Sequence, residues 1–289
     1  MRDTDRLRAD AESLAAQLPE FQLLERELST GHYGGAPRKR AGHGEEFWQY
    51  RSQTPEDSAS AIDWRRSATG DDFYIREQEL QTARLMEIWV DPSEGFDWRS
   101  DENLPTKADE ARVLLTALAL RFAESGDLAA VLGSSKHPGR SSQLASKLIE
   151  DSCQTAASSA MPPLRNETGH VVIASDFYGN PEPLRNWVRQ TAAKGCQGLL
   201  LQVVDPMEAD FPFAGRVRFR RPGGALSRIF GRTEGLKDDY LERFKTRQAE
   251  IRAIAQRVGW SFQTCVVGEP RRALAHKLMT GLIHGASPA

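Results

Sequence analysis

The stretch "LMEIWVDPSEG", Leu85 to Gly95, decides the fold, because a mostly apolar run ends there on an acid, a proline and a glycine. An apolar run closed by turn-forming residues is typical of a strand that is buried on both faces. Four similar runs follow, "LAAVLG", "HVVIAS", "GLLLQVV" and "SFQTCVV", with helical patterns at about 107–124, 141–152, 182–194, 238–258 and 270–284. This alternation predicts an α/β fold with a doubly wound, mostly parallel sheet.

Three of the predicted strands run directly into an aspartate, namely Asp91, Asp176 and Asp205. Because the carboxyl ends of parallel strands lie at one edge of a sheet, we expect these carboxylates to gather there, with Ser93 in the loop beside Asp91. A cluster of this kind would favour a hard cation. The alternative is that each aspartate caps the turn or helix after it, as the Asp-Pro pairs at 91–92 and 205–206 would do.

The composition excludes several classes of protein. The chain of 289 residues has 38 Lys and Arg against 40 Asp and Glu, so no overall charge attracts it to nucleic acid or to an anionic membrane. Its apolar stretches are shorter than the roughly 18 residues that a membrane helix needs, and the charged N-terminus does not resemble a secretory signal. Three scattered cysteines suit a reducing compartment. We therefore expect a cytoplasmic protein without membrane insertion.

The sequence contains no motif that specifies catalysis. It lacks G-x-S-x-G, and no Walker A or G-x-G-x-x-G loop follows a strand. Its six histidines are scattered. We therefore predict a protein that is not an enzyme and has no catalytic residues. The alternative is a metal-dependent phosphohydrolase that uses Asp91 and Asp176, which would require a bound divalent ion and an activated nucleophile.

The region before the first core strand has a different texture. Leucines and Phe21 recur at mostly three- and four-residue spacings between residues 5 and 28, which predicts an amphipathic helix. A connector rich in glycine and basic residues follows, and residues 45–84 suit short strands and turns around "FWQYR", "IDW" and "DFYIRE". The predicted organisation is an N-terminal helix at 1–30, a β-rich segment at 31–84 and an α/β domain at 85–289.

The β-rich segment resembles a known family. "GHGEEFWQYRSQTPEDSASAIDWRRSA" followed by "FYIRE" is similar to the signature of bacterial DUF58 proteins, in which such a segment precedes a von Willebrand factor A-like domain. We expect ion pairs or backbone hydrogen bonds from Arg51, Asp63 and Arg76 to fasten the segment to that domain. An interaction surface is compatible with this role. The signature positions that would form it are Glu46, Phe47, Arg51, Asp57, Asp63, Trp64, Arg76 and Glu77.

The resemblance also implies a metal site that has lost part of its ligands. The A-domain site uses Asp-x-Ser-x-Ser after the first strand, together with a threonine and a distant aspartate. Asp91 and Ser93 match, and Asp176 would be the distant acid. Gly95 has no hydroxyl, however, and no threonine can be assigned. The resemblance therefore implies a degenerate site formed by Asp91, Ser93 and Asp176, which binds Mg²⁺ weakly or not at all, and no cofactor.

A basic stretch, "RVRFRRPGG", offers a second candidate surface. Its arginines, Arg216, Arg218, Arg220 and Arg221, could meet an acidic partner, because guanidinium groups match carboxylate geometry. The alternative is that they lie on the wet side of a strand whose turn is "RPGG". Nucleic-acid binding through this stretch is a weaker third option, which steeply salt-dependent affinity would reveal.

The family resemblance finally implies a partner. Genes of DUF58 proteins commonly lie beside those of MoxR-type AAA+ ATPases. The implied role is a non-catalytic protein-interaction module, an adaptor or assembly factor that works with such an ATPase on a client protein. We expect no nucleic acid among its partners.

Overall fold

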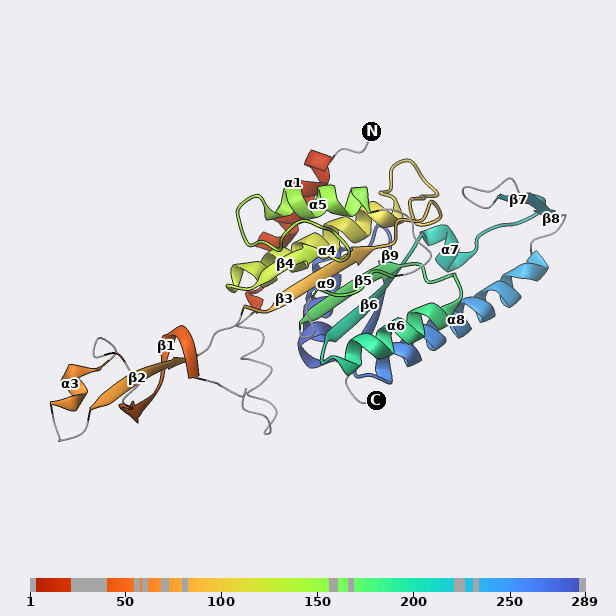
Figure 1. The fold of residues 1–289 in the computed structure, drawn as a ribbon. Helices are drawn as coiled ribbons and strands as arrows, with labels where there is room; N and C mark the ends of the chain where they lie inside the picture. The colour runs from red at the N-terminus through yellow and green to blue at the C-terminus, as the bar shows by residue number, and fades with distance from the viewer. Residues whose placement is uncertain are drawn as a thin grey trace. The chain divides into compact units, whose positions relative to one another are not determined.

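The chain forms two compact units, residues 1–30 with 84–289 and residues 31–83. The first unit holds a five-stranded sheet and a small hairpin, and the second holds a two-stranded sheet (Figure 1). The computed structural model describes residues 4–21, 41–54, 58, 62–68, 73–79, 83–155, 161–165, 169–220, 227–230 and 234–285.

The central sheet of the first unit is parallel throughout, with the strand order β4-β3-β5-β6-β9. The apolar runs form these strands because their side chains are buried on both faces, as in β5, where all six residues are buried. The predicted α/β fold with a doubly wound sheet is therefore confirmed. The strands are β3 (Leu85–Val90), β4 (Leu128–Val131), β5 (His170–Ser175), β6 (Gln197–Val204) and β9 (Ser261–Val266).

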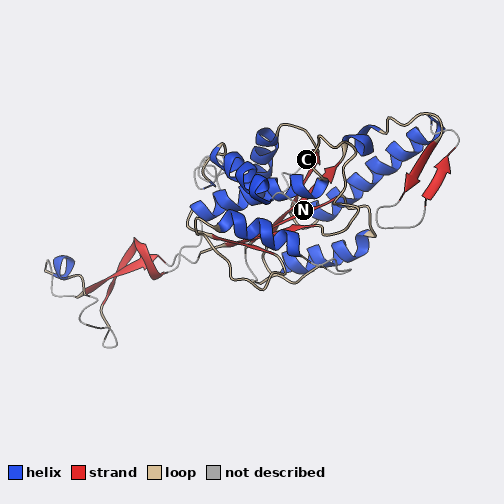
Figure 2. Cartoon of the chain, turned by 90° about the horizontal axis from the view of Figure 1, so that it is seen from above, coloured by secondary structure: helices blue, strands red, loops and turns tan. Residues whose placement is uncertain are grey.

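Helices cover both faces of this sheet (Figures 1 and 2). One core cluster joins α1, α4, α5 and α9 to side chains such as Ile88 and Val172, and a second joins α6 and α8 to Val171 and Ile173. The alternation between Val171 and Val172 follows from the two-residue period of a strand. The helices are α1 (Thr4–Ala16), α4 (Lys107–Glu124), α5 (Leu144–Gln154), α6 (Pro181–Ala193), α7 (Pro206–Asp210), α8 (Glu234–Gln256) and α9 (Arg271–His284).

The N-terminal helix α1 packs on the outside of α4 and α5. Its apolar stripe buries Leu7 and Leu14, as the spacing predicted. Beyond the end of α1, Phe21 is fully buried and its ring meets that of Phe122 edge-on, with centroids 5.2 Å apart. The predicted helix extended to residue 28, and its last part lies outside the described residues. No helix in the described part of the chain is both long and apolar enough to cross a bilayer.

The second unit contains an antiparallel pair, β1 (Ala41–Ser52) and β2 (Tyr74–Glu79), and the short helix α3 (Trp64–Ser67). Strands are present around "FWQYR" and "DFYIRE", as predicted, but β1 has 12 residues where a short strand was expected. Around "IDW" the structure has a single bridge between Ile62 and Ile75, and then a helical turn that the sequence did not reveal. Asp63 begins that turn because its carboxylate accepts a hydrogen bond from the backbone N–H of Arg66.

The basic stretch forms a hairpin of β7 (Val217–Arg220) and β8 (Ser227–Phe230). The predicted strand is thus present, and Arg216 and Arg218 are exposed. The predicted "RPGG" turn lies outside the described residues.

Candidate functional site at the carboxyl edge of the sheet

Asp91, Asp176 and Asp205 lie at one edge of the central sheet, as the sequence predicted. Each directly follows a strand, and the three strands β3, β5 and β6 are parallel neighbours. Ser93 lies in the loop beside Asp91, where its backbone N–H donates to Asp91 Oδ1 over 2.8 Å. Several carboxylates therefore lie at the carboxyl ends of the strands. The groups that bind them determine which ligands this part of the protein can bind.

Asp91 is engaged by its own chain through both oxygens. Besides the Ser93 bond, Asp91 Oδ2 accepts the hydroxyl of Ser175 over 2.6 Å. Ser175 Oγ in turn accepts the backbone N–H of Phe177 over 3.0 Å. Phe177 has φ = 55°, a left-handed conformation that is uncommon for a non-glycine residue. Asp91 thus ties the end of β3 to the end of β5.

Asp176 meets a buried lysine instead of solvent. Lys107 is the first residue of α4, and its side chain is 1% exposed. Lys107 Nζ donates to Asp176 Oδ2 over 3.0 Å, and to Glu208 Oε1 and Oε2 over 2.9 and 3.1 Å. Two carboxylates, one directly after β5 and one on helix α7, therefore share one ammonium group.

Three aromatic rings line the surroundings of this ammonium. Lys107 Nζ lies 5.9 Å from the ring centroids of Phe96 and Trp98, and 5.4 Å from that of Tyr178. The negative faces of aromatic rings attract cations at such distances. Rings and carboxylates together account for a charged group that is almost completely withdrawn from water.

Asp205 begins the short helix α7. Its carboxylate accepts the backbone N–H of Met207 over 2.9 Å and that of Ser100 over 2.8 Å, and Glu208 Oε2 accepts the backbone N–H of Asp205 over 3.0 Å. This reciprocal pattern is a capping box. Asp205 thus follows the capping alternative. Burial raises the pKa of Glu208, whereas the charge of Lys107 acts to lower it.

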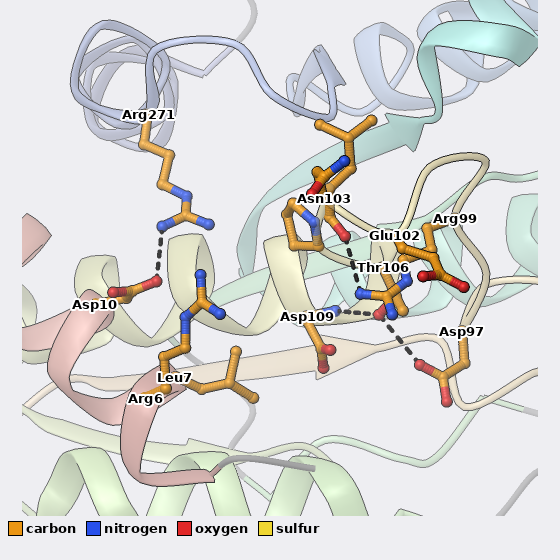
Figure 3. A pocket seen from close by; sticks show the side chains of 12 residues that line it. Arg6, Leu7, Asp10, Asp97, Arg99, Glu102, Asn103, Thr106, Asp109 and Arg271 are labelled. Atoms are coloured by element: carbon orange, nitrogen blue, oxygen red, sulfur yellow. Dashed lines mark hydrogen bonds and ion pairs between the residues drawn. The ribbon is translucent and has the colours of Figure 1, made fainter.

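Thr106 acts as a helix cap. Its hydroxyl oxygen accepts the backbone N–H of Asp109 over 3.1 Å at the start of α4, and its hydroxyl lies 3.1 Å from Asp97 Oδ1. Beside it lies a cavity of about 410 Å³. Figure 3 shows residues of both charge signs around this cavity, where Arg271 meets Asp10. Because the lining carries side chains of both charge signs, the cavity does not define a site for one class of ligand.

The residues at this edge do not fit the metal site that the resemblance implies. Asp176 Oδ2 is bound by an ammonium ion, and both oxygens of Asp91 accept protein hydrogen bonds. Among the described residues, no three His, Cys, Asp or Glu side chains are arranged to hold a metal ion. The cation of this edge is supplied by the chain itself.

The sequence did not reveal Lys107 or Glu208 as parts of this site. A lysine at the start of a helix is expected to be solvated, and its two acidic partners lie 69 and 101 positions further along the chain. The sequence "PMEAD" after Asp205 was the one available signal, because an acid three residues after a helix cap indicates a capping box.

The predicted signature residues belong to the second unit, and the arginines of the basic stretch lie in β7 or next to it in the sequence. Asp63 Oδ2 accepts the hydroxyl of Tyr50 over 3.1 Å, within the second unit. Trp64 is 59% exposed, and its ring meets that of Phe73 edge-on. Asp57 and Arg221 lie outside the described residues, as do the side chains of Glu46, Phe47, Arg51, Arg76, Glu77 and Arg220. The predicted attachment of this segment to the α/β domain stays a prediction.

Fold and site together define a doubly wound α/β protein in which a buried lysine of the chain binds two acids beside the carboxyl ends of the strands. The family described as "Protein of unknown function DUF58" matches residues 49–250, which is more than half of the chain. The protein belongs to the DUF58 family, as the signature segment indicated.

One solved structure matches part of this chain. It is described as the crystal structure of an aerotolerance-related membrane protein from Bacteroides fragilis NCTC 9343 with multiple mutations to serines. The two chains are 13% identical, the match covers 70% of this chain and 98% of that one, and the TM-score is 0.41. No curated protein matches the chain.

Titration with Mg²⁺ and Mn²⁺ should give no more heat with the wild type than with Asp91→Ala. Gly95→Ser should behave in the same way, although a Cβ at Gly95 meets no atom within 4 Å and the serine therefore fits. The reason is that Lys107 already occupies Asp176. Isothermal calorimetry provides the measurement. Tight binding by the wild type that Asp91→Ala abolishes would show that the acids of this edge bind a metal ion after all.

Proposed function

We propose that this protein is a non-catalytic protein-interaction module whose α/β unit is a von Willebrand A-like domain with a built-in cation. The observation that carries the proposal is the buried ammonium of Lys107, bound by Asp176 and Glu208. In a metal-dependent domain a divalent ion would compensate such acids and leave a coordination position for a partner or a substrate. Here a permanent side chain compensates them.

The same contacts count against hydrolysis. A phosphohydrolase that used Asp91 and Asp176 would need both carboxylates free to hold an ion. The hydroxyl of Ser175 donates to Asp91, and its oxygen accepts the backbone N–H of Phe177. This arrangement holds two strand ends together, and it leaves neither the Ser175 hydroxyl nor Asp91 Oδ2 without a partner.

For the partner we propose a MoxR-type AAA+ ATPase, with the protein acting as an adaptor or assembly factor for a client. Support comes from membership of the DUF58 family and from the exposed aromatic surface of the second unit. Trp64 and Phe73 are 59% and 49% exposed there, and the exposed Arg65 and Arg66 lie on the same helical turn as Trp64. Tryptophan and arginine are among the residues most enriched in the energetically dominant parts of interfaces.

The test is affinity purification of the tagged full-length chain from its native host with ATP present, scored for an AAA+ ATPase against an untagged control. Trp64→Ala should reduce the yield of the ATPase, whereas Arg189→Ala, at an exposed position on α6, should not. Absence of any enriched ATPase would contradict the partner. Hydrolysis of a phosphoester that requires Mn²⁺ and is lost in Asp176→Asn would contradict the non-catalytic role.

A further inference from the structure

The central sheet has two outermost strands, β4 and β9, and they differ in what lies along their outer sides. The edge strand β4 has four residues, and its outer side pairs with Gly139 through two hydrogen bonds of 3.0 Å between the backbones of Ala129 and Gly139. At the other edge, β9 pairs with β6 over six consecutive residues without a shift in register. Within the described residues no strand lies on its other side.

The outward backbone groups of β9 can be identified from its hydrogen bonds. Val267 N–H donates to Val204 O of β6 over 2.9 Å. Because successive residues of a strand direct their backbone groups to opposite sides, Phe262, Thr264 and Val266 face away from β6. The carbonyl of Val266 accepts the N–H of Glu269, so the backbone groups left without a backbone partner in the described part of the chain are those of Phe262, a residue 8% exposed, and of Thr264.

The sequence of β9 lacks several of the devices that usually protect a sheet edge. "SFQTCV" contains no proline, no charged side chain and no bulge. Natural proteins use such features to prevent the pairing of an exposed edge with another chain. An unprotected edge is therefore suited to strand addition, in which an extended segment of a partner joins the sheet.

A basic groove lies beside the first half of this edge, where Ser261, Phe262 and Gln263 contribute to its lining. It has a volume of about 350 Å³ and is formed by α8, β9 and α9. No aspartate or glutamate is among the residues that line it, all of which the structure describes. Arg252 extends over the ring of Phe262, 5.3 Å from its centroid. The cationic and histidine side chains of the lining are Arg252, His276, Lys277 and His284.

We propose that the β9 edge binds an extended, acidic segment of a protein partner by strand addition. Backbone groups of Phe262 and Thr264 would pair with the segment, and Arg252 and Lys277 on either side would meet its carboxylates. The groove lies at the amino-terminal half of β9, whereas Lys107 lies at the carboxyl edge of the sheet. The groove is therefore separate from the Lys107 site, and this proposal does not depend on the function proposed above.

The test uses a fluorescent, amidated eight-residue peptide of alternating glutamate and valine, and its lysine–valine counterpart, with the full-length protein. Fluorescence anisotropy should show that the acidic peptide binds and that the lysine–valine peptide does not. Arg252→Glu/Lys277→Glu should weaken it by about tenfold or more, because reversed charges repel the segment. The matched control is Arg189→Glu/Lys237→Glu, an exposed arginine and an exposed lysine outside the groove, which should retain wild-type affinity.

Hydrogen exchange shows whether the peptide adds to the strand. The amides of Phe262 and Thr264 should become protected when the acidic peptide binds, and those of the β4 edge should not change. The proposal is overturned if the acidic peptide does not bind, if the control variant loses as much affinity as the groove variant, or if binding leaves these two amides unprotected. Equal binding of a single-stranded oligonucleotide of the same charge would also overturn it, because the groove would then be a phosphate site.

Discussion

Replacing Lys107 with methionine is expected to destabilise the protein by about 3–5 kcal/mol at pH 7, the usual cost of removing one partner from a buried ion pair. Methionine preserves most of the length and the apolar part of the side chain, so the loss reports on the charge. Asp176 and Glu208, with side chains 13% and 20% exposed, would then have no cation. Urea denaturation measures the difference, and Lys237→Met, at an exposed position of α8, is the control.

The difference in unfolding free energy between the wild type and Lys107→Met should decrease as the pH falls. Burial already raises the pKa of Glu208, and the charge of Lys107 opposes that rise, so the pKa rises further in Lys107→Met. A carboxyl group whose pKa is higher in the folded state stabilises the fold fully only below its unfolded pKa, and this contribution is lost as the pH rises through the folded value. The gap to the wild type should therefore narrow from pH 7 toward the ordinary value of 4.5.

A triple variant separates charge from packing. Lys107→Met combined with Asp176→Asn and Glu208→Gln removes the ammonium and both negative charges, and should recover much of the stability that the single variant loses. Equal stabilities of Lys107→Met and the Lys237→Met control would show that the buried ammonium does not compensate the acids. Metal titration of the folded single variant would then reveal whether these acids bind an ion.

The fold was largely predictable because its signals are local. The bounds of β3 and β5 agree with the apolar runs "LMEIWV" and "HVVIAS", and α4 agrees with the helical pattern at 107–124. A strand buried on both faces leaves a continuous apolar run, which needs no knowledge of its neighbours. The helical turn α3 was missed because four residues are too few to show a helical period.

The site was predictable only as far as topology determines it. Parallel strands bring Asp91, Asp176 and Asp205 to one edge whatever their side chains contact. Whether those acids hold a metal ion, a cap or a lysine depends on partners distant in sequence. Lys107 lies at the start of a helix whose other residues are largely apolar, and nothing local distinguishes its burial from the usual solvated position.

Replacing Arg271 with methionine is the second change expected to have a large effect, about 3–5 kcal/mol. Arg271 begins α9 and holds Glu110 of α4 in a forked pair, with Nε–Oε1 and Nη2–Oε2 distances of 2.9 and 2.7 Å. Glu110 is only 2% exposed, so its charge would stay buried without a cation. Arg271 also bonds Asp10 of α1 over 3.1 Å (Figure 3). It therefore connects three helices on one face of the sheet.

A double-mutant cycle isolates the pair. Glu110→Met alone leaves Arg271 without its buried partner. The double variant Arg271→Met/Glu110→Met removes both charges, so its loss of unfolding free energy should be much smaller than the sum of the losses of the two single variants. Arg271→Lys should lie between wild type and Arg271→Met, since an ammonium cannot make the forked contact. Arg185→Met is the comparison, because its partners Glu182 and Glu250 are 55% and 35% exposed and a surface pair contributes at most about 1 kcal/mol. If the single variants were simply additive, packing of α9 against the sheet would hold this face together, and the ion pair would contribute only to the choice of partner helices.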